Sequence, residues 1–341
     1  MVIARRRNEA RNAIMVESLS KSYGSLKAVD SVSLGIAEGE VFGLLGPNGA
    51  GKTTMISMLV TMRKPSAGKA TVNGFDVAAQ PDAVRKSIGI VFQDPSLDDE
   101  LTALENLDMH CAMFGVPNRD RKARIEEVVR LVGLESHLRS LVKTFSGGMK
   151  RRLEIARGLV HTPKILFLDE PTVGLDPQTR AGIWDYIKKL NKERNVTIIL
   201  TTHYMDEADA VCGRVAIMDR GKIMALGTPS SLKNALGGDV VSLECDGHEE
   251  CTKRLNKINW VKHVVRHDGF LDVRVERGEE KIPKLLRMAE QSGMSVKSVS
   301  LRKPSLDDVF LHYTGRTIRE QEASPKDAMR LRRKGWGAGR R

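Results

Sequence analysis

The 341-residue sequence is poor in cysteine, in aromatic residues and in long hydrophobic runs. Its four cysteines, Cys111, Cys212, Cys245 and Cys251, are scattered, which is typical of free thiols in a reducing compartment. No uncharged apolar stretch approaches the roughly 20 residues that span a bilayer, and residues 1–12 lack the apolar core of a signal peptide. We therefore expect the chain to stay in the cytoplasm.

The excess of positive charge is concentrated at the two ends of the chain. Of the net charge of +12, residues 1–12 carry +3 and residues 317–341 carry +5, so the 304 residues between them carry only +4. Basic, polar ends are usually solvated tails, although some contact anionic lipid or nucleic acid. We therefore predict tails at 1–12 and 317–341 and expect no specific nucleic-acid partner.

The first half of the chain has the order of elements that a phosphate site requires. Residues 14–45 alternate in the manner of strands and indicate an antiparallel layer. The apolar run 41–45 then enters a glycine-rich loop, and residues 52–62 continue as a helix. The buried strands 165–168 and 196–200 flank a helical segment, 179–194, and this alternation implies parallel strands joined by crossover helices.

The loop matches the motif G-x-x-x-x-G-K-[ST] in full. In such a loop successive backbone N–H groups turn inward around phosphate oxygens, and the following helix directs its positive end to the same place. Lys52 is predicted to reach the β- and γ-phosphates, Thr53 to bind Mg²⁺ and Thr54 to bond the α-phosphate. The predicted ATP-binding residues of the loop are Gly46, Pro47, Asn48, Gly49, Ala50, Gly51, Lys52, Thr53 and Thr54.

An acidic pair closes the buried strand 165–168. Asp169 is predicted to bind the Mg²⁺ shell, and Glu170 to polarise the attacking water as the general base. A strand that simply ends in solvated carboxylates is the alternative, and the glycine loop upstream disfavours it. The expected substrate and cofactor are thus ATP and Mg²⁺.

A second anion site occurs 94 residues after Lys52. Ser146, Gly147 and Gly148 open the helical segment 149–160 and present a hydroxyl and N–H groups at its start. One triphosphate hardly needs both sites from one chain. In these motifs residues 14–228 resemble the ATP-binding cassette (ABC) ATPases, whose signature begins with this Ser-Gly-Gly and faces the nucleotide held by a partner subunit.

The resemblance implies roles for four further residues. Tyr23 matches the aromatic side chain that stacks on adenine, and Gln93 matches the glutamine that senses Mg²⁺ and the transmembrane partner. Asp176 matches the loop that crosses the dimer interface, here called the interface loop (residues 173–177), and His203 matches the switch histidine at the γ-phosphate. Two residues depart from the pattern, since Met149 stands where many members carry glutamine and Val173 where many carry serine.

The sequence after about 225 predicts a smaller α+β domain. Strands and helices are expected in the order β-α-β-β-α-β, the ferredoxin-like pattern, over residues 239–245, 249–258, 260–267, 270–276, 279–292 and 294–302, with a hairpin turn at 267–269. Residues 303–315 resemble the ending of the daunorubicin-resistance ATP-binding subfamily. Cys245, His248 and Cys251 offer three ligands to a soft metal, but a fourth at suitable spacing is lacking, so we expect no metal site there.

The sequence therefore predicts an α/β fold, in which an ABC-type P-loop domain over 13–228 has a mixed sheet, an antiparallel β layer and a helical insertion over about 95–160. A ferredoxin-like accessory domain over 229–316 follows. The resemblance implies the ATPase subunit of an exporter of drugs or other hydrophobic compounds. Its expected partners are a second copy of itself, in an ATP-sandwich dimer, and integral membrane permease subunits, with the chain peripheral on the inner face of the membrane.

Two alternatives stay open at this point. The first is a soluble ABC ATPase acting on ribosomes or nucleic acid, although those groups usually carry two cassettes or long coiled-coil insertions. The second is a P-loop GTPase, but residues 191–194 lack the aspartate of the guanine-reading NKxD motif.

Overall fold

The computed structural model of the chain describes residues 12–94, 96–245, 258–267, 270–291 and 295–315, together with Thr252 and Leu255. Apart from Asn12, the predicted basic tails lie outside these residues, as do His248, Cys251, the turn residues 268–269 and most of the helix predicted over 249–258. The chain divides into two compact units between Leu226 and Gly227. Among the described residues, no helix is long and apolar enough to cross a membrane.

The predicted antiparallel layer is confirmed as a four-stranded sheet in the order β2-β1-β4-β5. Its strands are β1 (Asn12–Tyr23), β2 (Leu26–Ala37), β4 (Ala67–Val72) and β5 (Phe75–Asp76). Ile14 pairs with Ile36 and Val16 with Leu34 across β1 and β2, and all four side chains are buried. The spacing of two in the sequence thus places one face of this layer in the core.

The second sheet carries the phosphate loop and has the order β10-β9-β3-β8-β7-β6. Parallel pairing joins β9, β3, β8, β7 and β6 in turn, as the alternation of strands and helices predicts. The strands are β3 (Val41–Leu45), β6 (Ile88–Val91), β7 (Ile165–Asp169), β8 (Thr197–Thr202), β9 (Arg214–Asp219) and β10 (Lys222–Gly227). Because β8 separates β3 from β7, the glycine loop and the acidic pair emerge from the same edge of the sheet with one strand between them.

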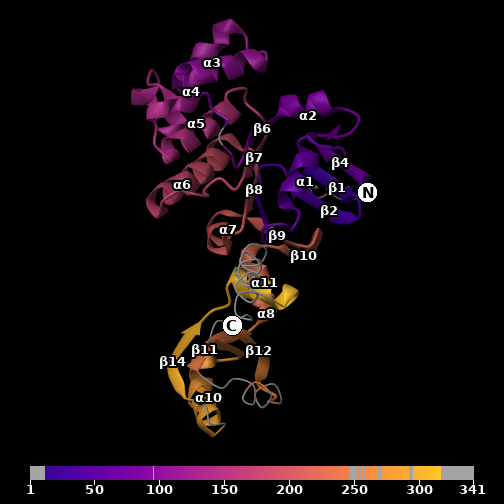
Figure 1. Cartoon of the computed structure of the whole chain (residues 1–341), viewed down its shortest axis with the longest axis vertical. Helices are drawn as coiled ribbons and strands as arrows, with labels where there is room; N and C mark the ends of the chain where they lie inside the picture. Colours follow the sequence, from indigo (N-terminus) through magenta and orange to yellow (C-terminus); the bar gives the residue numbers. More distant parts are fainter. Residues whose placement is uncertain are drawn as a thin grey trace, which may run out of the picture. The chain divides into compact units, whose positions relative to one another are not determined.

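The helices of this unit separate into two groups (Figure 1). α1 (Lys52–Leu59) and α2 (Pro81–Ser87) lie on the side of the antiparallel layer, whereas α3 (Ala103–Met113), α4 (Asn118–Val132), the short helices η1 (Glu135–His137) and η2 (Val142–Thr144), and α5 (Gly147–Leu159) form the predicted helical insertion. α6 (Pro177–Arg194) and α7 (Met205–Val211) complete the unit. α1 ends three residues before the predicted limit because Thr61 takes a positive φ of 65° and turns the chain.

The second unit has an antiparallel sheet in the order β12-β13-β11-β14, which is the ferredoxin-like order. Its elements are α8 (Pro229–Leu236), β11 (Asp239–Cys245), β12 (Val261–His267), β13 (Phe270–Val275), α10 (Gly278–Gln291), β14 (Val296–Arg302) and α11 (Leu306–Thr314). Leu243 and Val273 pack with Leu285 of α10 in its core. Ser305 and Asp308 form a capping box at the start of α11, and Arg302 binds the Asp308 carboxylate, so the segment that resembles the daunorubicin subfamily fixes this helix to β14.

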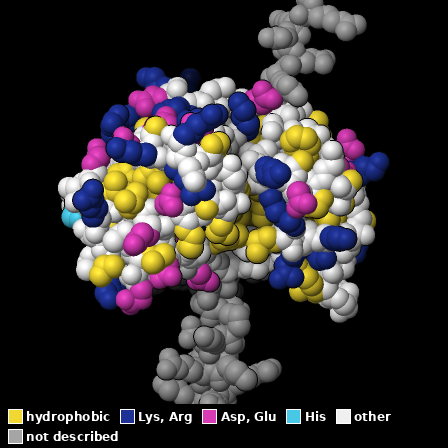
Figure 2. Space-filling view, turned by 90° about the horizontal axis from the view of Figure 1, so that it is seen from above, with side chains coloured by type: hydrophobic (Ala, Val, Ile, Leu, Met, Phe, Trp, Pro, Cys, Tyr) yellow, Lys and Arg dark blue, Asp and Glu magenta, His cyan; other side chains and the backbone are white. Residues whose placement is uncertain are grey.

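Charged side chains of both signs are interspersed on the face shown in Figure 2, around exposed apolar side chains and without a continuous basic patch. Nucleic-acid-binding surfaces instead gather Lys and Arg on one face. Figure 2 shows one face of the molecule, and the expectation of no specific nucleic-acid partner stays a prediction.

Two glycines test how closely α5 approaches the parallel sheet. A Cβ atom at Gly89 in β6 would collide with the carbonyl oxygen of Gly158 in α5, whereas a Cβ at Gly182 in α6 would meet no atom within 4 Å. We expect Gly89→Ala to lower the free energy of unfolding by about 1–3 kcal/mol through overpacking. Gly182→Ala should raise it by about 0.5–1 kcal/mol. Urea unfolding followed by circular dichroism measures both, and equal midpoints would contradict the close approach.

Candidate active site

The glycine loop follows β3 and leads directly into α1. Gly46 and Gly51 have φ angles of 148° and 105°, which few residues other than glycine adopt. A Cβ atom would also collide with the carbonyl oxygen of Met218 at Gly46 and with that of Ala28 at Gly51. Both glycines are therefore required by the path of the loop and by its close packing.

The loop and the first turn of α1 offer a set of donors suited to an anion. The first N–H groups of an α-helix have no carbonyl partner within the helix, and they point along its positive end. Within the loop, the Ala50 N–H donates to the Pro47 carbonyl at 3.1 Å and closes the turn, while Asn48 and Gly49 are exposed. Thr53 is exposed and Thr54 half-buried on α1. The nine predicted residues thus form one continuous segment that runs from the end of β3 into the first turn of α1.

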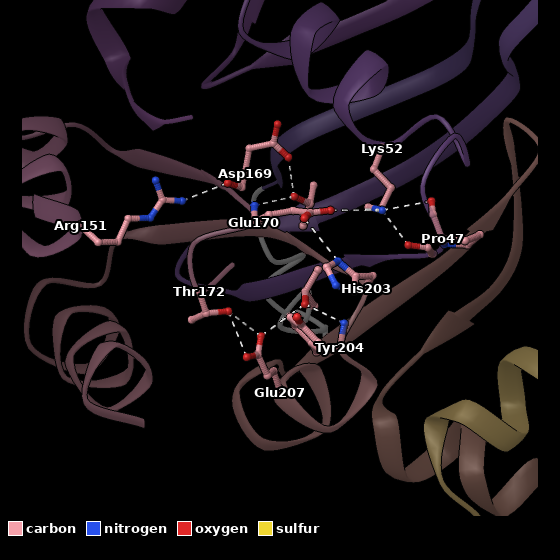
Figure 3. Close-up of polar contacts among 12 residues, drawn as sticks. Pro47, Lys52, Arg151, Asp169, Glu170, Thr172, His203, Tyr204 and Glu207 are labelled. Atoms are coloured by element: carbon pink, nitrogen blue, oxygen red, sulfur yellow. Dashed lines mark hydrogen bonds and ion pairs between the residues drawn. The ribbon is translucent and has the colours of Figure 1, made fainter. Parts of the chain in front are cut away.

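Lys52 points back over this loop (Figure 3). Its side chain is only 4% exposed, and its Nζ donates to the Gly46 carbonyl at 2.6 Å and to the Pro47 carbonyl at 3.2 Å. The same nitrogen lies 3.6 Å from Oε1 of Glu170. The structure therefore brings the predicted phosphate-binding lysine and the predicted base together.

The acidic pair at the end of β7 is aligned by a hydroxyl of the neighbouring strand. Thr201 of β8 donates to Oδ1 of Asp169 at 2.5 Å and accepts from the Glu170 N–H at 2.9 Å. Glu170 has a φ of 47°, which is uncommon for a residue other than glycine or asparagine. This turn directs the Glu170 carboxylate away from the strand and toward Lys52 (Figure 3).

The carboxylate of Glu170 also lies 3.3 Å from Nδ1 of His203, which follows β8. Burial opposes ionisation of Glu170, but the hydrogen bond with His203 and the positive charge of Lys52 outweigh it and lower the pKa of Glu170. Glu170 is thus ionised at neutral pH, as a group that accepts a proton must be.

Ser146 caps α5, and its Oγ accepts from the Met149 N–H at 3.3 Å. A Cβ atom at Gly148 would collide with the side chain of Thr179 in α6, and the Thr179 N–H donates to Asp176 Oδ1 at 3.0 Å. The hydrogen bond with Thr179 lowers the pKa of Asp176. The signature and the interface loop therefore pack together at the starts of α5 and α6, with strands β6–β8 between α5 and α1 in Figure 1.

Tyr23 and Gln93 lie at or just beyond the ends of two other strands, β1 and β6. Tyr23 ends β1, is 39% exposed, and its ring faces the cations of Lys21 at 5.4 Å and Arg63 at 5.5 Å. Gln93 is exposed two residues after the end of β6. Both positions leave the side chains accessible to a ligand or partner, and their roles stay predictions.

Arg151 is a structural residue of the site that the sequence reasoning missed. Its buried guanidinium donates to the carbonyl oxygens of Phe92, Asp169 and Pro171 and pairs with Glu154 at 3.0 Å. Figure 3 shows the bond to Asp169. It thereby joins the segment after β6, which carries Gln93, to the end of β7. The available signal was a charged pair at i, i+3 on the apolar face of α5.

The side chain of Cys245 and the residues His248 and Cys251 lie outside the described residues, so the expectation of no metal site there stays a prediction. The side chains predicted to bind Mg²⁺ are oxygen donors: the Asp169 carboxylate, the Thr53 hydroxyl and the Gln93 amide. Oxygen ligands are the type that Mg²⁺ prefers. The donor set therefore fits this ion.

These features define a class of protein. A glycine loop after β3 and a carboxylate that leaves β7 toward Lys52, with β8 between the two strands, are the arrangement of a P-loop NTPase. Residues 29–173 match the family model described as ABC transporter, and residues 227–314 match that of the ATP-binding protein DrrA1-3-like, C-terminal domain. The chain belongs to the family of ABC transporter ATP-binding proteins, and it is an ATPase.

Relatives match along nearly the whole chain. The linearmycin resistance ATP-binding protein LnrL of Bacillus subtilis is 38% identical over 311 residues, which make up 90% of this chain and 100% of that protein. The daunorubicin resistance ATP-binding protein DrrA3 of Streptomyces coeruleorubidus is 38% identical over 316 residues, 92% of this chain and 100% of that protein. The dimeric, post-hydrolysis structure of the ATP-binding cassette MJ0796 bound to ADP and Pi is 29% identical, covers 63% of this chain and 98% of that one, and has a TM-score of 0.58.

Arg151 provides a test of how the site is supported. Arg151→Met should lower the free energy of unfolding by about 3–5 kcal/mol, because it leaves the buried Glu154 carboxylate without its cation and takes one donor from each of three carbonyl oxygens. The control is Lys150→Met, which removes a more exposed ion pair with Asp99 and should cost less than about 1 kcal/mol. Similar losses for the two variants in urea unfolding would show that Arg151 does not hold the strand ends.

Proposed function

We propose that the chain is the ATP-binding and ATP-hydrolysing subunit of an exporter, that it works as a pair, and that it drives separate integral membrane permease subunits from the inner face of the membrane. In this proposal residues 13–228 form the cassette and residues 229–316 an accessory domain between the basic tails. The resistance functions named for LnrL and DrrA3 support export of drugs or other hydrophobic compounds. They favour this function over action on ribosomes or nucleic acid.

The observation that carries the proposal is the separation of two anion sites within one chain. Lys52, Glu170 and His203 form one cluster, and Ser146 and Asp176 cap the starts of α5 and α6. Strands β6–β8 lie between α5 and α1, the helix of Lys52, in Figure 1. A second copy, turned to face the first, would supply its Ser146 to the nucleotide bound over Lys52. The dimeric form of the MJ0796 cassette supports this arrangement.

The residues of the site divide the work of hydrolysis among them. Lys52 and the loop N–H groups bind the β- and γ-phosphates, and Tyr23 stacks on the adenine. Thr53, Asp169 and Gln93 would hold Mg²⁺, which when bound neutralises phosphate charge and orients the phosphate oxygens. Glu170 accepts a proton from the attacking water, while His203 orients Glu170 and contacts the γ-phosphate.

Replacement of the base tests the catalytic assignment. Glu170→Gln should keep ATP binding but lower kcat by about 10²–10⁴-fold, because the amide cannot accept the proton of the water. The variant should also accumulate an ATP-bound dimer, detectable by size-exclusion chromatography with ATP. Glu193→Gln, an exposed glutamate of α6, is the matched control and should hydrolyse at the parent rate. Parent activity in Glu170→Gln would rule out the base assignment.

Mixed dimers test whether the site is shared. Ser146→Arg should block hydrolysis at the nucleotide held by the other copy, since the long cation would fill the space that faces its γ-phosphate. In dimers of one Ser146→Arg copy and one Lys52→Ala copy, one site retains both intact halves and should still hydrolyse ATP. The control is Ser230→Arg on the exposed surface of α8. Dimers in which both copies carry Ser146→Arg yet turn over ATP normally would refute the shared site.

A further inference from the structure

The buried carboxylate of Glu207 lies outside the predicted site but contacts both chain segments that carry the predicted base and the predicted histidine. Glu207 of α7 is 5% exposed, and it accepts hydrogen bonds from the Thr172 hydroxyl at 3.0 and 2.9 Å and from the Thr202 hydroxyl at 3.3 Å. Thr172 lies two residues after Glu170, and Thr202 immediately precedes His203. Figure 3 shows this second cluster of contacts beside the first. One carboxylate thus joins the segment of the base to the segment of the histidine.

Arg180 of α6 extends the contact toward the interface loop. Its Nε lies 3.2 Å from Oε1 of Glu207, and its Nη2 donates to the Leu175 carbonyl at 3.4 Å. The backbone N–H of Arg180 also donates to the Asp176 carbonyl at 3.0 Å. The guanidinium therefore contacts the interface loop and the buried carboxylate at once.

The same guanidinium reaches the histidine through an aromatic ring. The Arg180 guanidinium carbon lies 4.6 Å from the centroid of the Tyr204 ring, a cation–π distance, and the ring centroids of Tyr204 and His203 are 4.1 Å apart. The Tyr204 N–H in turn donates to the Thr202 hydroxyl at 2.9 Å. A shift of the interface loop would consequently move groups packed directly against His203.

If the Glu207 carboxylate only filled space at this position, its burial would cost desolvation free energy without a compensating benefit. Burial raises the pKa of Glu207, and the Thr172 hydrogen bond and the Arg180 charge only partly oppose that effect. An apolar side chain of similar volume would avoid the desolvation cost of a buried ion pair, although it could neither accept bonds from Thr172 and Thr202 nor pair with Arg180. The geometry therefore favours a positioning role over simple filling of the core.

We propose that the Glu207–Arg180 pair is a positioning device that couples the place of the interface loop to the alignment of Glu170 and His203. This coupling rests on the proposed function, because the interface loop is taken to contact the second copy. Contact with the second copy would fix the position of the interface loop. Arg180 would then fix the Glu207 carboxylate, and Glu207 would keep Glu170 and His203 aligned. Neither Glu207 nor Arg180 touches the reacting atoms.

The test is a double-mutant cycle with Glu207→Gln and Arg180→Gln in the full chain. Each single variant should lower kcat by about 10- to 100-fold, since small misplacement of catalytic groups has effects of this size. KM for ATP should stay within about twofold of the parent, because Lys52 and the phosphate loop are untouched. The double variant should be no slower than the slower single variant, since both changes interrupt one connection.

Controls separate positioning from general destabilisation. Asp206→Asn changes the neighbouring, exposed carboxylate of α7 and should leave kcat unchanged. Arg180→Lys keeps the charge but loses the planar fork, so it should recover only part of the rate. Arg180→Gln alters a side chain that is one-quarter exposed, and it keeps the test usable if Glu207→Gln does not fold. Unfolding temperatures confirm that the variants compared are folded.

Several outcomes would overturn the proposal. Parent kcat in folded Glu207→Gln or Arg180→Gln excludes it, as do losses that multiply in the double variant. A raised KM with unchanged kcat would point to ATP binding instead. The rate per chain measured against protein concentration tests the proposed function separately. If the parent rate per chain does not change with protein concentration, the result contradicts pairing. If that rate rises with concentration while the losses in kcat multiply in the double variant, the result contradicts only the Glu207–Arg180 link.

Discussion

The hydroxyl of Thr201 bonds to both residues of the acidic pair. Because β7 and β8 are parallel and Asp169 is paired with Thr201 in their register, this hydroxyl lies where it can donate to the Asp169 carboxylate and accept from the Glu170 N–H. The positive φ of Glu170 follows immediately and turns its side chain toward Lys52 and His203. One hydroxyl in a fixed strand register therefore sets the directions of two carboxylates that the proposed chemistry uses differently.

Buried charges connect the ends of three adjacent strands to this point. Arg151 binds carbonyl oxygens after β6 and at the end of β7, and Glu207 binds hydroxyls after β7 and at the end of β8. Isolated charges of this kind are costly to bury, but each is satisfied by several directed partners. The two residues reach the sheet from α5 and α7. Helices on either side of the acidic strand are thus tied to the place where the strands end.

The parts of the site that the sequence predicted are those encoded by local spacing. The loop from Gly46 to Thr54, the strand before it and the acidic pair each occupy a few consecutive residues, so their residue types reveal the chemistry directly. Arg151, Thr201 and Glu207 bond to residues up to 59 positions away in the sequence, through contacts that depend on strand order and helix packing. The positive φ of Glu170 likewise follows from tertiary contacts, since the propensity of glutamate gives no sign of it.

The fold tolerates both departures from the family pattern, Met149 and Val173. Met149 bonds to Ser146 through its backbone N–H, so the capped start of α5 does not depend on the side chain that replaces glutamine. Val173 is 38% exposed in the interface loop, so its side chain adds little to the core. The cap of α5 therefore does not depend on the Met149 side chain, and the core does not depend on the Val173 side chain.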